Sequence, residues 1–494
     1  MDQAPTNQLW PSISAKHNLQ KVVGNAISVL ASDVTNRAAT FFLYLLVARY
    51  LGVFEYGQLS LGLTFFQTFQ LLAIGGMKTL VTRQIAREKQ DTDLYLVNGS
   101  AVTVLLSVGS VLLLVLLTQV MNYSPATTLV ILWLSLGLFP YALSMICDAL
   151  FEAWEQMQYI TYANVIVNVF KIGLGFLLLL QSHSLHLLVI LLFFCHTAVL
   201  GVKWWLMLRH ITRPQIKVDV SFCVKMLKST VTFLGIDGLM AIMSSFNIIL
   251  LSKLASELEV GLLSAASQLL VPISLVFQSI MISVFPRMCR SYEPSYQSLR
   301  RLSERLLELL LAMVLPVAVV LFFLADAILL FLYGNQDFSL AAGALRILVG
   351  VLVLRVFTQV LGRVLLASLQ EKKTLRILAI DLLTTVILGP ILISQYGLMG
   401  AALTSLLARV VDFVQHYVPV SRMFSKIAVG NLVWKPALAS AIMAIYLALG
   451  SSDNLFSTIV LAGAIYFAVL FVLMAWSVGG VHQLKARYLF VWSK

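Results

Sequence analysis

The chain has 494 residues, of which 60% are hydrophobic and only 11% are charged. Soluble proteins carry about 25% charged residues, so this composition excludes a water-soluble protein. Apolar runs extend from about residue 22 to residue 477 and leave no room for a separate soluble domain. We therefore expect one membrane-embedded body with short connections.

Fourteen runs of mostly apolar residues are about 20 residues long, which is enough to cross a bilayer as a helix. In the first half they are 24–48, 58–80, 97–118, 127–149, 159–180 and 185–206. In the second half they are 231–252, 261–285, 306–331, 342–367, 375–394 and 398–420, followed by a pair at 435–450 and 455–477. The sequence predicts an all-α polytopic membrane protein with fourteen transmembrane helices.

The distribution of basic residues predicts how the chain is oriented. Segments on the side of the N-terminus hold 25 of the 34 Lys and Arg residues when Lys203, Arg376 and Lys435, near the ends of their spans, are counted with the residues that flank the membrane. The opposite loops hold only Arg49 and Lys253. Because basic loops stay in the cytoplasm and the number of spans is even, both termini are predicted to be cytoplasmic. Topology and contact with anionic lipid also account for the net charge of +12, so no nucleic-acid partner is expected.

The chain also repeats weakly at an offset of 204 residues. Gly57 falls on Gly261, and Asp33 falls on Asp237. Both copies start from the cytoplasm, which predicts two parallel-related six-helix halves. Transporters built from parallel repeats hold substrate between the halves and alternate access by rocking them.

These patterns set the expected domain boundaries. They are a cytoplasmic N-terminal segment at 1–23, an N-lobe at 24–208, a basic cytoplasmic linker at 209–230, a C-lobe at 231–420, an extra helix pair at 435–477 and a basic cytoplasmic tail at 478–494.

No motif for enzymatic chemistry is present in the sequence. It contains no GxxxxGK phosphate loop, no HExxH and no CxxC among its four cysteines, and the external loops are short. We therefore expect no enzyme activity, no cofactor and no metal site.

Charges inside the predicted helices are the candidates for function. A charge at the centre of a helix costs about 2.5–3.5 kcal/mol on insertion scales, so it faces a partner or a hydrated cavity. The predicted substrate-binding residues are Arg37, Lys171, Arg355, Gln359, Arg363 and Arg409. The alternative to substrate binding is that these charges form ion pairs within a helix. Asp33 and Arg37 are four residues apart and Arg409 and Asp412 are three apart, so each pair could neutralise itself.

Two further carboxylates suggest ion coupling. Asp33 and Asp237 occupy equivalent positions in the repeat. We hypothesise that one of them titrates or binds a cation, which would couple transport to a proton or sodium gradient.

Several short motifs carry a family resemblance across nearly the whole chain. They are Ala48-Arg49-Tyr50-Leu51-Gly52, Glu55-Tyr56-Gly57, Leu332-Tyr333-Gly334 and Tyr396-Gly397-Leu398-Met399-Gly400. With these motifs the chain resembles the polysaccharide/O-antigen lipid flippases of the multidrug/oligosaccharidyl-lipid/polysaccharide exporter superfamily. It departs from the family pattern at Asn247, where Asp is frequent, and at Leu262, where Tyr is common.

The resemblance implies a multi-pass protein of the cell inner membrane with halves like those of the multidrug exporters. Its substrate would be a polyprenyl-pyrophosphate-linked oligosaccharide, flipped from the inner to the outer leaflet, with polysaccharide polymerase or export machinery as an expected partner. The alternatives are a multidrug cation antiporter of the same superfamily and a peptidoglycan lipid-precursor flippase. An excess of basic groups at mid-span favours an anionic substrate over a cationic drug.

Overall fold

The computed structural model describes residues 12–292, 296–424, 429–450 and 454–478. Within those ranges every regular element is a helix and no strand is present. Eleven helices there are long and apolar enough to cross a membrane. The predicted all-α membrane class is confirmed, while the count of fourteen spans and the side of the termini stay predictions.

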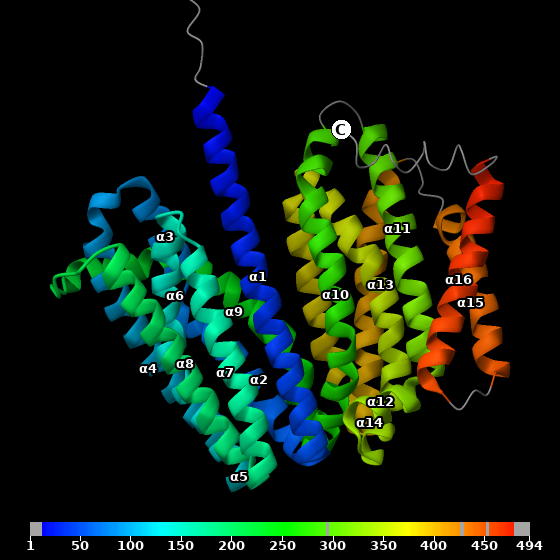
Figure 1. Cartoon of the computed structure of the whole chain (residues 1–494), viewed down its shortest axis with the longest axis horizontal. Coiled ribbons are helices and arrows are strands. Elements are labelled where there is room, and N and C mark those ends of the chain that lie inside the picture. The colour runs from blue at the N-terminus through cyan, green and yellow to red at the C-terminus, as the bar shows by residue number, and fades with distance from the viewer. Residues whose placement is uncertain (1–11, 293–295, 425–428, 451–453, 479–494) are drawn as a thin grey trace, which may run out of the picture. The chain divides into compact units, whose positions relative to one another are not determined.

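The chain divides into two compact units, and the first holds the residues up to Leu51 together with Gln58–Ser245. Its helices are α1 (Ser12–Tyr50), α2 (Val53–Ile74), α3 (Met77–Arg87), α4 (Thr92–Met121), α5 (Pro125–Leu136), α6 (Leu138–Ala153), α7 (Gln158–Ser182), α8 (Leu185–His210) and most of α9 (Val220–Leu254), with the 3-10 turn η1 (Lys89–Asp91). Within this unit α1 packs against α7, and α6 against α8 (Figure 1).

The second unit holds Gly52–Gly57 and the residues from Phe246 on. Its helices are α10 (Glu257–Tyr292), α11 (Tyr296–Phe323), α12 (Ala325–Tyr333), α13 (Ala342–Ala367), α14 (Glu371–Met423), α15 (Val429–Leu449) and α16 (Leu455–Val478), with the 3-10 turn η2 (Gln336–Ala341). Apolar side chains of α10, α11, α13 and α14 form its core. The lobe and linker boundaries expected from the sequence stay predictions.

Glycines break helices inside two of the predicted spans. Gly75 and Gly76 adopt positive φ angles of 56° and 73°, a conformation that L side chains rarely adopt, and they separate α2 from α3. Gly137 separates α5 from α6 in the span predicted at 127–149. At the start of α5, Ser124 caps the helix by accepting a hydrogen bond from the Thr127 backbone N–H at 3.2 Å, and Pro125 follows at the first helical position.

Helix α14 is a hairpin of two antiparallel arms that meet at Gly397. Its φ of 51° and ψ of −124° are not helical, so the chain reverses there. A Cβ at Gly389, on the first arm, would touch the Thr404 side chain on the second at 3.9 Å. The arms correspond to the spans predicted at 375–394 and 398–420.

Two glycines that the repeat aligns with each other are in direct contact. A Cβ added at Gly57 would lie 2.0 Å from the carbonyl oxygen of Glu257 and 3.0 Å from the backbone nitrogen of Gly261. One added at Gly261 would lie 2.3 Å from the carbonyl oxygen of Val53. The starts of α2 and α10 thus approach each other so closely that only glycine fits at either position.

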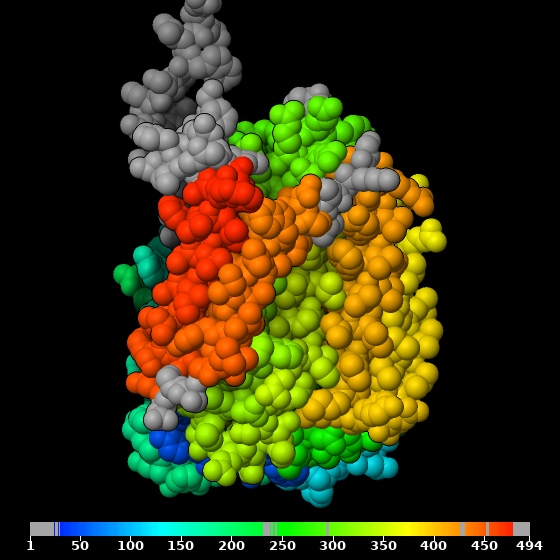
Figure 2. Space-filling view, turned by 90° about the vertical axis from the view of Figure 1, so that its right-hand side faces the viewer, coloured from blue at the N-terminus to red at the C-terminus, as the bar shows by residue number. Residues whose placement is uncertain are grey.

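The last two helices lie side by side on the outside of the second unit (Figure 2). They dock on α11 through two buried polar contacts. The Tyr466 hydroxyl donates to the Ala312 carbonyl at 2.9 Å, and Lys435 lies 3.4 Å from the Glu308 carboxylate. Apolar side chains of all three helices fill the space between these contacts.

Replacing Gly57 with Ala should lower the unfolding temperature of the purified protein by several degrees. The added methyl group collides with backbone rather than with a flexible side chain, and overpacking of this kind costs about 1–3 kcal/mol. Gly173→Ala is the matched control, because a Cβ at Gly173 in α7 meets nothing within 4 Å. Equal unfolding temperatures for the two variants would contradict the close helix crossing.

Candidate functional site

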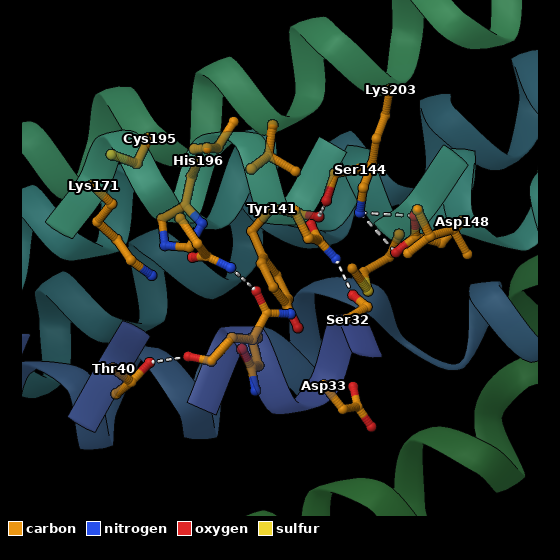
Figure 3. A pocket seen from close by; sticks show the side chains of 18 of the residues that line it. Ser32, Asp33, Thr40, Tyr141, Ser144, Asp148, Lys171, Cys195, His196 and Lys203 are labelled. Carbon is orange, nitrogen blue, oxygen red and sulfur yellow. Dashed lines mark hydrogen bonds and ion pairs between the residues drawn. The ribbon is translucent and has the colours of Figure 1, made fainter. Parts of the chain in front are cut away.

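A cavity of about 620 Å³ lies within the first unit (Figure 3). Helices α1, α2, α3, α6, α7 and α8 line it. Its polar side chains are Ser32, Asp33, Asn36, Thr40, Gln67, Gln70, Lys78, Tyr141, Ser144, Asp148, Glu152, Asn164, Asn168, Lys171, His196 and Lys203. Ligand sites have volumes of roughly 300–1,000 Å³, so both its size and its polarity suit a hydrated binding site between apolar helices.

Polar contacts hold α1 and α7 together along one wall of the cavity. The Asn164 amide donates to the Ser32 hydroxyl at 2.7 Å, and the Asn168 amide donates to the Asn36 side-chain oxygen at 2.5 Å. On each helix these residues are four apart, so they lie on one face. Interhelical hydrogen bonds of this kind fix neighbouring helices in a membrane and leave the remaining amide groups facing the cavity.

Two ion pairs occupy the part of the cavity that Asp148 and Glu152 of α6 line. The Lys203 ammonium lies 2.7 Å from the Asp148 carboxylate, with side chains only 1% and 5% exposed (Figure 3). The Lys78 ammonium lies 2.8 Å from Glu152, and this pair is partly exposed. Because each carboxylate has a lysine partner, this part of the cavity is close to neutral.

Lys171 lies beside Cys195 and His196, away from those ion pairs (Figure 3). Among the residues that the structure describes, no carboxylate lies within ion-pair distance of its ammonium. The His196 ring stacks on Phe66 with centroids 5.0 Å apart, and its edge meets the ring of Tyr141. Lys171 is therefore a cation whose charge is free to act on a ligand.

Lys171, predicted from its mid-span position, and Asp33, predicted from its place in the repeat, both line this cavity. Arg37 does not belong to the lining, and its side chain is exposed. No ion pair between Asp33 and Arg37 exists in the described part of the chain, so the structure does not show the pairing considered as an alternative.

Three predicted residues lie on α13 in the second unit. Arg355 is exposed and donates to the Ser274 hydroxyl at 3.5 Å. The Arg363 guanidinium lies over the ring of Phe285, 5.0 Å from its centre. The side-chain oxygen of Gln359 is buried and has no hydrogen-bond partner in the described structure.

The remaining predicted residues lie on α14 and α9. Arg409 donates to Asp412 at 2.6 Å, which is the pairing considered from their spacing. Asp237 lies outside the residues whose side chains the structure describes. None of the four predicted residues on α13 and α14 belongs to the lining of the cavity in the first unit.

Sequence reasoning missed the lysine that is most deeply buried in the cavity. Lys203 was counted among the basic residues that flank the membrane, but it lies inside α8 and is 1% exposed. It also missed the polar face of α7, although Asn164, Asn168 and Lys171 are spaced by four and three residues. That spacing was a signal in the sequence, since residues three and four apart lie on one face of a helix.

Comparison with family models identifies the family of this chain. The model of the polysaccharide biosynthesis protein family matches residues 22–292, more than half of the chain. The chain belongs to this family. A second model, that of the lipid II flippase MurJ, matches residues 239–486. The chain is thus a flippase of the multidrug/oligosaccharidyl-lipid/polysaccharide exporter superfamily, a multi-pass membrane protein and not an enzyme.

Solved structures share this fold at low sequence identity. A lipid II flippase MurJ in an inward closed conformation superposes with a TM-score of 0.74 at 17% identity, covering 95% of this chain and 100% of its own. An inward-facing multidrug resistance transporter of the superfamily gives 0.60 at 16% identity, covering 81% of this chain and 100% of its own. A superfamily transporter from Pyrococcus furiosus, described as having a binding pocket of reversed polarity, gives 0.53 at 14% identity, with 80% and 96% covered. No curated protein sequence matches significantly.

Replacing Lys203 with Met should strongly lower the unfolding temperature of the purified flippase. Asp148 would keep a buried charge without a partner, and breaking a buried ion pair costs about 3–5 kcal/mol. The double variant Lys203→Met with Asp148→Leu removes both charges and should recover most of the loss. Lys78→Met is the control, since its pair with Glu152 is partly exposed and should matter less. Equal effects of the two single variants would contradict the burial of the Lys203 pair.

Proposed function

We propose that this flippase moves a polyprenyl-pyrophosphate-linked oligosaccharide from the inner to the outer leaflet of the inner membrane by alternating access. The substrate would be a repeat unit of O-antigen, capsule or exopolysaccharide. Family membership supports a lipid-linked substrate. The observation that carries the proposal is Lys171, the lysine of the cavity that has no carboxylate partner among the described residues.

The cavity matches the chemistry of such a head group. A pyrophosphate is an anion, and an ammonium donates charge-assisted hydrogen bonds to phosphate oxygens. Sugar hydroxyls both donate and accept hydrogen bonds, as side-chain amides do, and Asn36, Asn164 and Asn168 supply three amides on neighbouring helices. The aromatic rings of Phe66 and Tyr141 add apolar faces to the same cavity.

The charge distribution weighs against a cationic drug as substrate. Such a ligand needs free carboxylates in the cavity, but Asp148 and Glu152 are already neutralised by lysines. Asp33 has no ion pair in the described structure, but the cavity is lined by the three lysines Lys78, Lys171 and Lys203, so a single unpaired carboxylate leaves it no net negative charge for a cation.

A peptidoglycan lipid precursor is the second candidate substrate. The match of the MurJ model to residues 239–486 and the fold similarity to a lipid II flippase favour it. This precursor also joins a polyprenyl pyrophosphate to sugars, so Lys171 and the amides would serve it in the same way. The two substrates differ in the glycan and are separated by experiment below.

The other residues singled out in the sequence remain part of the proposal. Arg37, Arg355, Arg363 and Arg409 are proposed to attract the anionic head group along its path, since a guanidinium stays charged even when buried. Gln359 is proposed to bind the head group through its side-chain amide. Asp33 and Asp237 are proposed to couple the cycle to protons or sodium ions. Polysaccharide polymerase or export machinery is the proposed protein partner.

Lys171→Met should reduce export of surface polysaccharide by about tenfold or more in a strain that lacks its own flippase. A hydrogen bond to a charged group is worth about 1.5–3 kcal/mol, and 1.4 kcal/mol is a factor of ten. Lys171→Arg keeps the charge and should retain most of the export. Lys217→Met, an exposed lysine in the loop before α9, is the control and should export normally.

Expressing the flippase and the same variants in a strain depleted of its peptidoglycan-precursor flippase separates the two candidate substrates. Rescue of surface polysaccharide without rescue of growth supports the polysaccharide substrate, and the reverse result supports the precursor. Normal export by Lys171→Met would remove Lys171 from the substrate path. Normal export by Asp33→Asn would remove ion coupling at Asp33.

A further inference from the structure

Three aromatic rings, each from a different helix, meet in the wall of the first-unit cavity. Phe66 belongs to α2, Tyr141 to α6 and His196 to α8. The rings of Phe66 and His196 stack with centres 5.0 Å apart, and the Tyr141 ring is steeply inclined to both, at 5.5 and 5.7 Å. We call these three residues the aromatic wall. Because each ring contacts the other two, the rings fix one another's orientation.

The break between α5 and α6 makes room for the aromatic wall. A Cβ at Gly137 would lie 3.3 Å from the His196 ring and 3.5 Å from the Phe66 ring, so any larger residue would crowd both. Tyr141 lies one turn further along α6, where its backbone N–H donates to the Gly137 carbonyl at 3.1 Å. The wall is therefore held in place by packing, and little ordering is needed when a ligand binds.

The aromatic wall presents ring surface and unused polar atoms to the cavity. Phe66 is only 5% exposed, whereas Tyr141 and His196 are partly exposed where they line the cavity. In the described structure neither the Tyr141 hydroxyl nor the His196 ring nitrogens have a hydrogen-bond partner. A phenol hydroxyl donates and accepts, and a neutral imidazole has one donor and one acceptor. Both residues can therefore bind a polar ligand as well as pack against it.

Free amide groups lie on the same cavity surface. Asn164 and Asn168 each use their amide nitrogen in a bond to α1, which leaves their side-chain oxygens as acceptors. Asn36 uses its oxygen in one of these bonds, which leaves its nitrogen as a donor. Gln67 and Gln70 of α2 also line the cavity and have no side-chain partner among the described residues. The cavity thus offers both donors and acceptors without any charge.

Aromatic rings beside neutral amides match the chemistry of a sugar. A pyranose ring has faces of C–H groups, which pack on the negative face of an aromatic ring, and hydroxyl groups that pair with amides. A cation is also attracted to aromatic faces. Here, however, the Lys171 side chain lies beside His196 and would repel a second cation (Figure 3). The aromatic wall therefore suits an uncharged polar ring better than a cation.

The charges of the cavity restrict the kind of sugar. Its described lining holds three lysines and three carboxylates, and two of each form ion pairs. Lys171 and Asp33 remain, while Arg37 lies outside the lining. A pyrophosphate carries more than one negative charge and would take up Lys171. A carboxylate on the sugar would then lack a cation and share the cavity with Asp33, which is costly where water is scarce.

We propose that the aromatic wall is the binding site for the first sugar of the lipid-linked substrate, and that this sugar is an uncharged pyranose. The place of Lys171 beside His196 agrees with this arrangement, because the first sugar is bonded directly to the pyrophosphate (Figure 3). The inference rests on the proposed function and specifies the chemical class of its glycan.

Titration calorimetry of the purified full chain in detergent tests the site with short-chain ligands. The ligands are farnesyl pyrophosphate alone and farnesyl pyrophosphate joined to glucose, galactose or the uronic acid of either sugar. At least one neutral sugar should bind about tenfold tighter than farnesyl pyrophosphate alone, and its uronic acid about tenfold or more weaker than that sugar. Equal affinities for the neutral sugar and its uronic acid, or no gain from either neutral sugar, would overturn the proposal.

Variants of the wall separate sugar binding from pyrophosphate binding. Tyr141→Ala should abolish the gain from the sugar and leave the affinity for farnesyl pyrophosphate unchanged, whereas Tyr141→Phe should keep most of the gain. Lys171→Met should weaken every ligand. Tyr162→Ala is the matched control, since this exposed tyrosine of α7 lies outside the cavity lining.

Two further variants complete the test. His196→Leu keeps apolar bulk and should also lose the gain, so it replaces Tyr141→Ala if that variant does not fold. A sugar gain that persists in the folded wall variants would overturn the site. Asp33→Asn should raise the affinity for the uronic acid toward that of the neutral sugar, and an unchanged difference would overturn the assignment of an uncharged sugar.

Binding is measured here without transport, so the two proposals can fail separately. If the wall variants lose the sugar gain but the flippase restores no polysaccharide export, the proposed function fails and the sugar site stands. If export is restored while no sugar adds affinity, the sugar site fails and the proposed function stands.

Discussion

A charged side chain in the hydrocarbon of a bilayer costs several kcal/mol unless a partner or water compensates it, and this cost shapes both units of the flippase. The first unit joins Lys203 to Asp148 and Lys78 to Glu152. The second joins Arg409 to Asp412 and Lys435 to Glu308. Without its partner, each of these side chains would be an uncompensated charge within the membrane. All of the pairs except Arg409–Asp412 also join two neighbouring helices.

The groups left over after this pairing are the ones that can act on something else. Among the described side chains that line the cavity of the first unit they are Lys171 and Asp33, on a surface rich in side-chain amides. In the second unit Asp381, on the α14 hairpin, has a buried Oδ1 atom without a hydrogen-bond partner in the described structure.

The sequence predicted the helices well, because long apolar runs have few other structures available in a membrane. It also predicted two separate spans at 375–394 and 398–420, and the chain reverses between them at Gly397. The breaks at Gly75 and Gly137 were missed, because glycine inside an apolar run is compatible with a continuous helix.

Single positions in the site were easier to predict than pairings. Lys171 was found because a charge at mid-span is unusual, and Asp33 because the repeat aligns it with Asp237. Lys203 was misassigned because its partner, Asp148, is 55 residues away, and a contact between distant helices leaves no local pattern.

Translocation measured in vesicles containing only the purified flippase tests the central claim most directly. The account predicts that a polyprenyl-pyrophosphate-linked oligosaccharide crosses much faster than in protein-free vesicles, and that Lys171→Met slows it. Transport of a cationic drug, with no acceleration of the lipid-linked oligosaccharide, would contradict it.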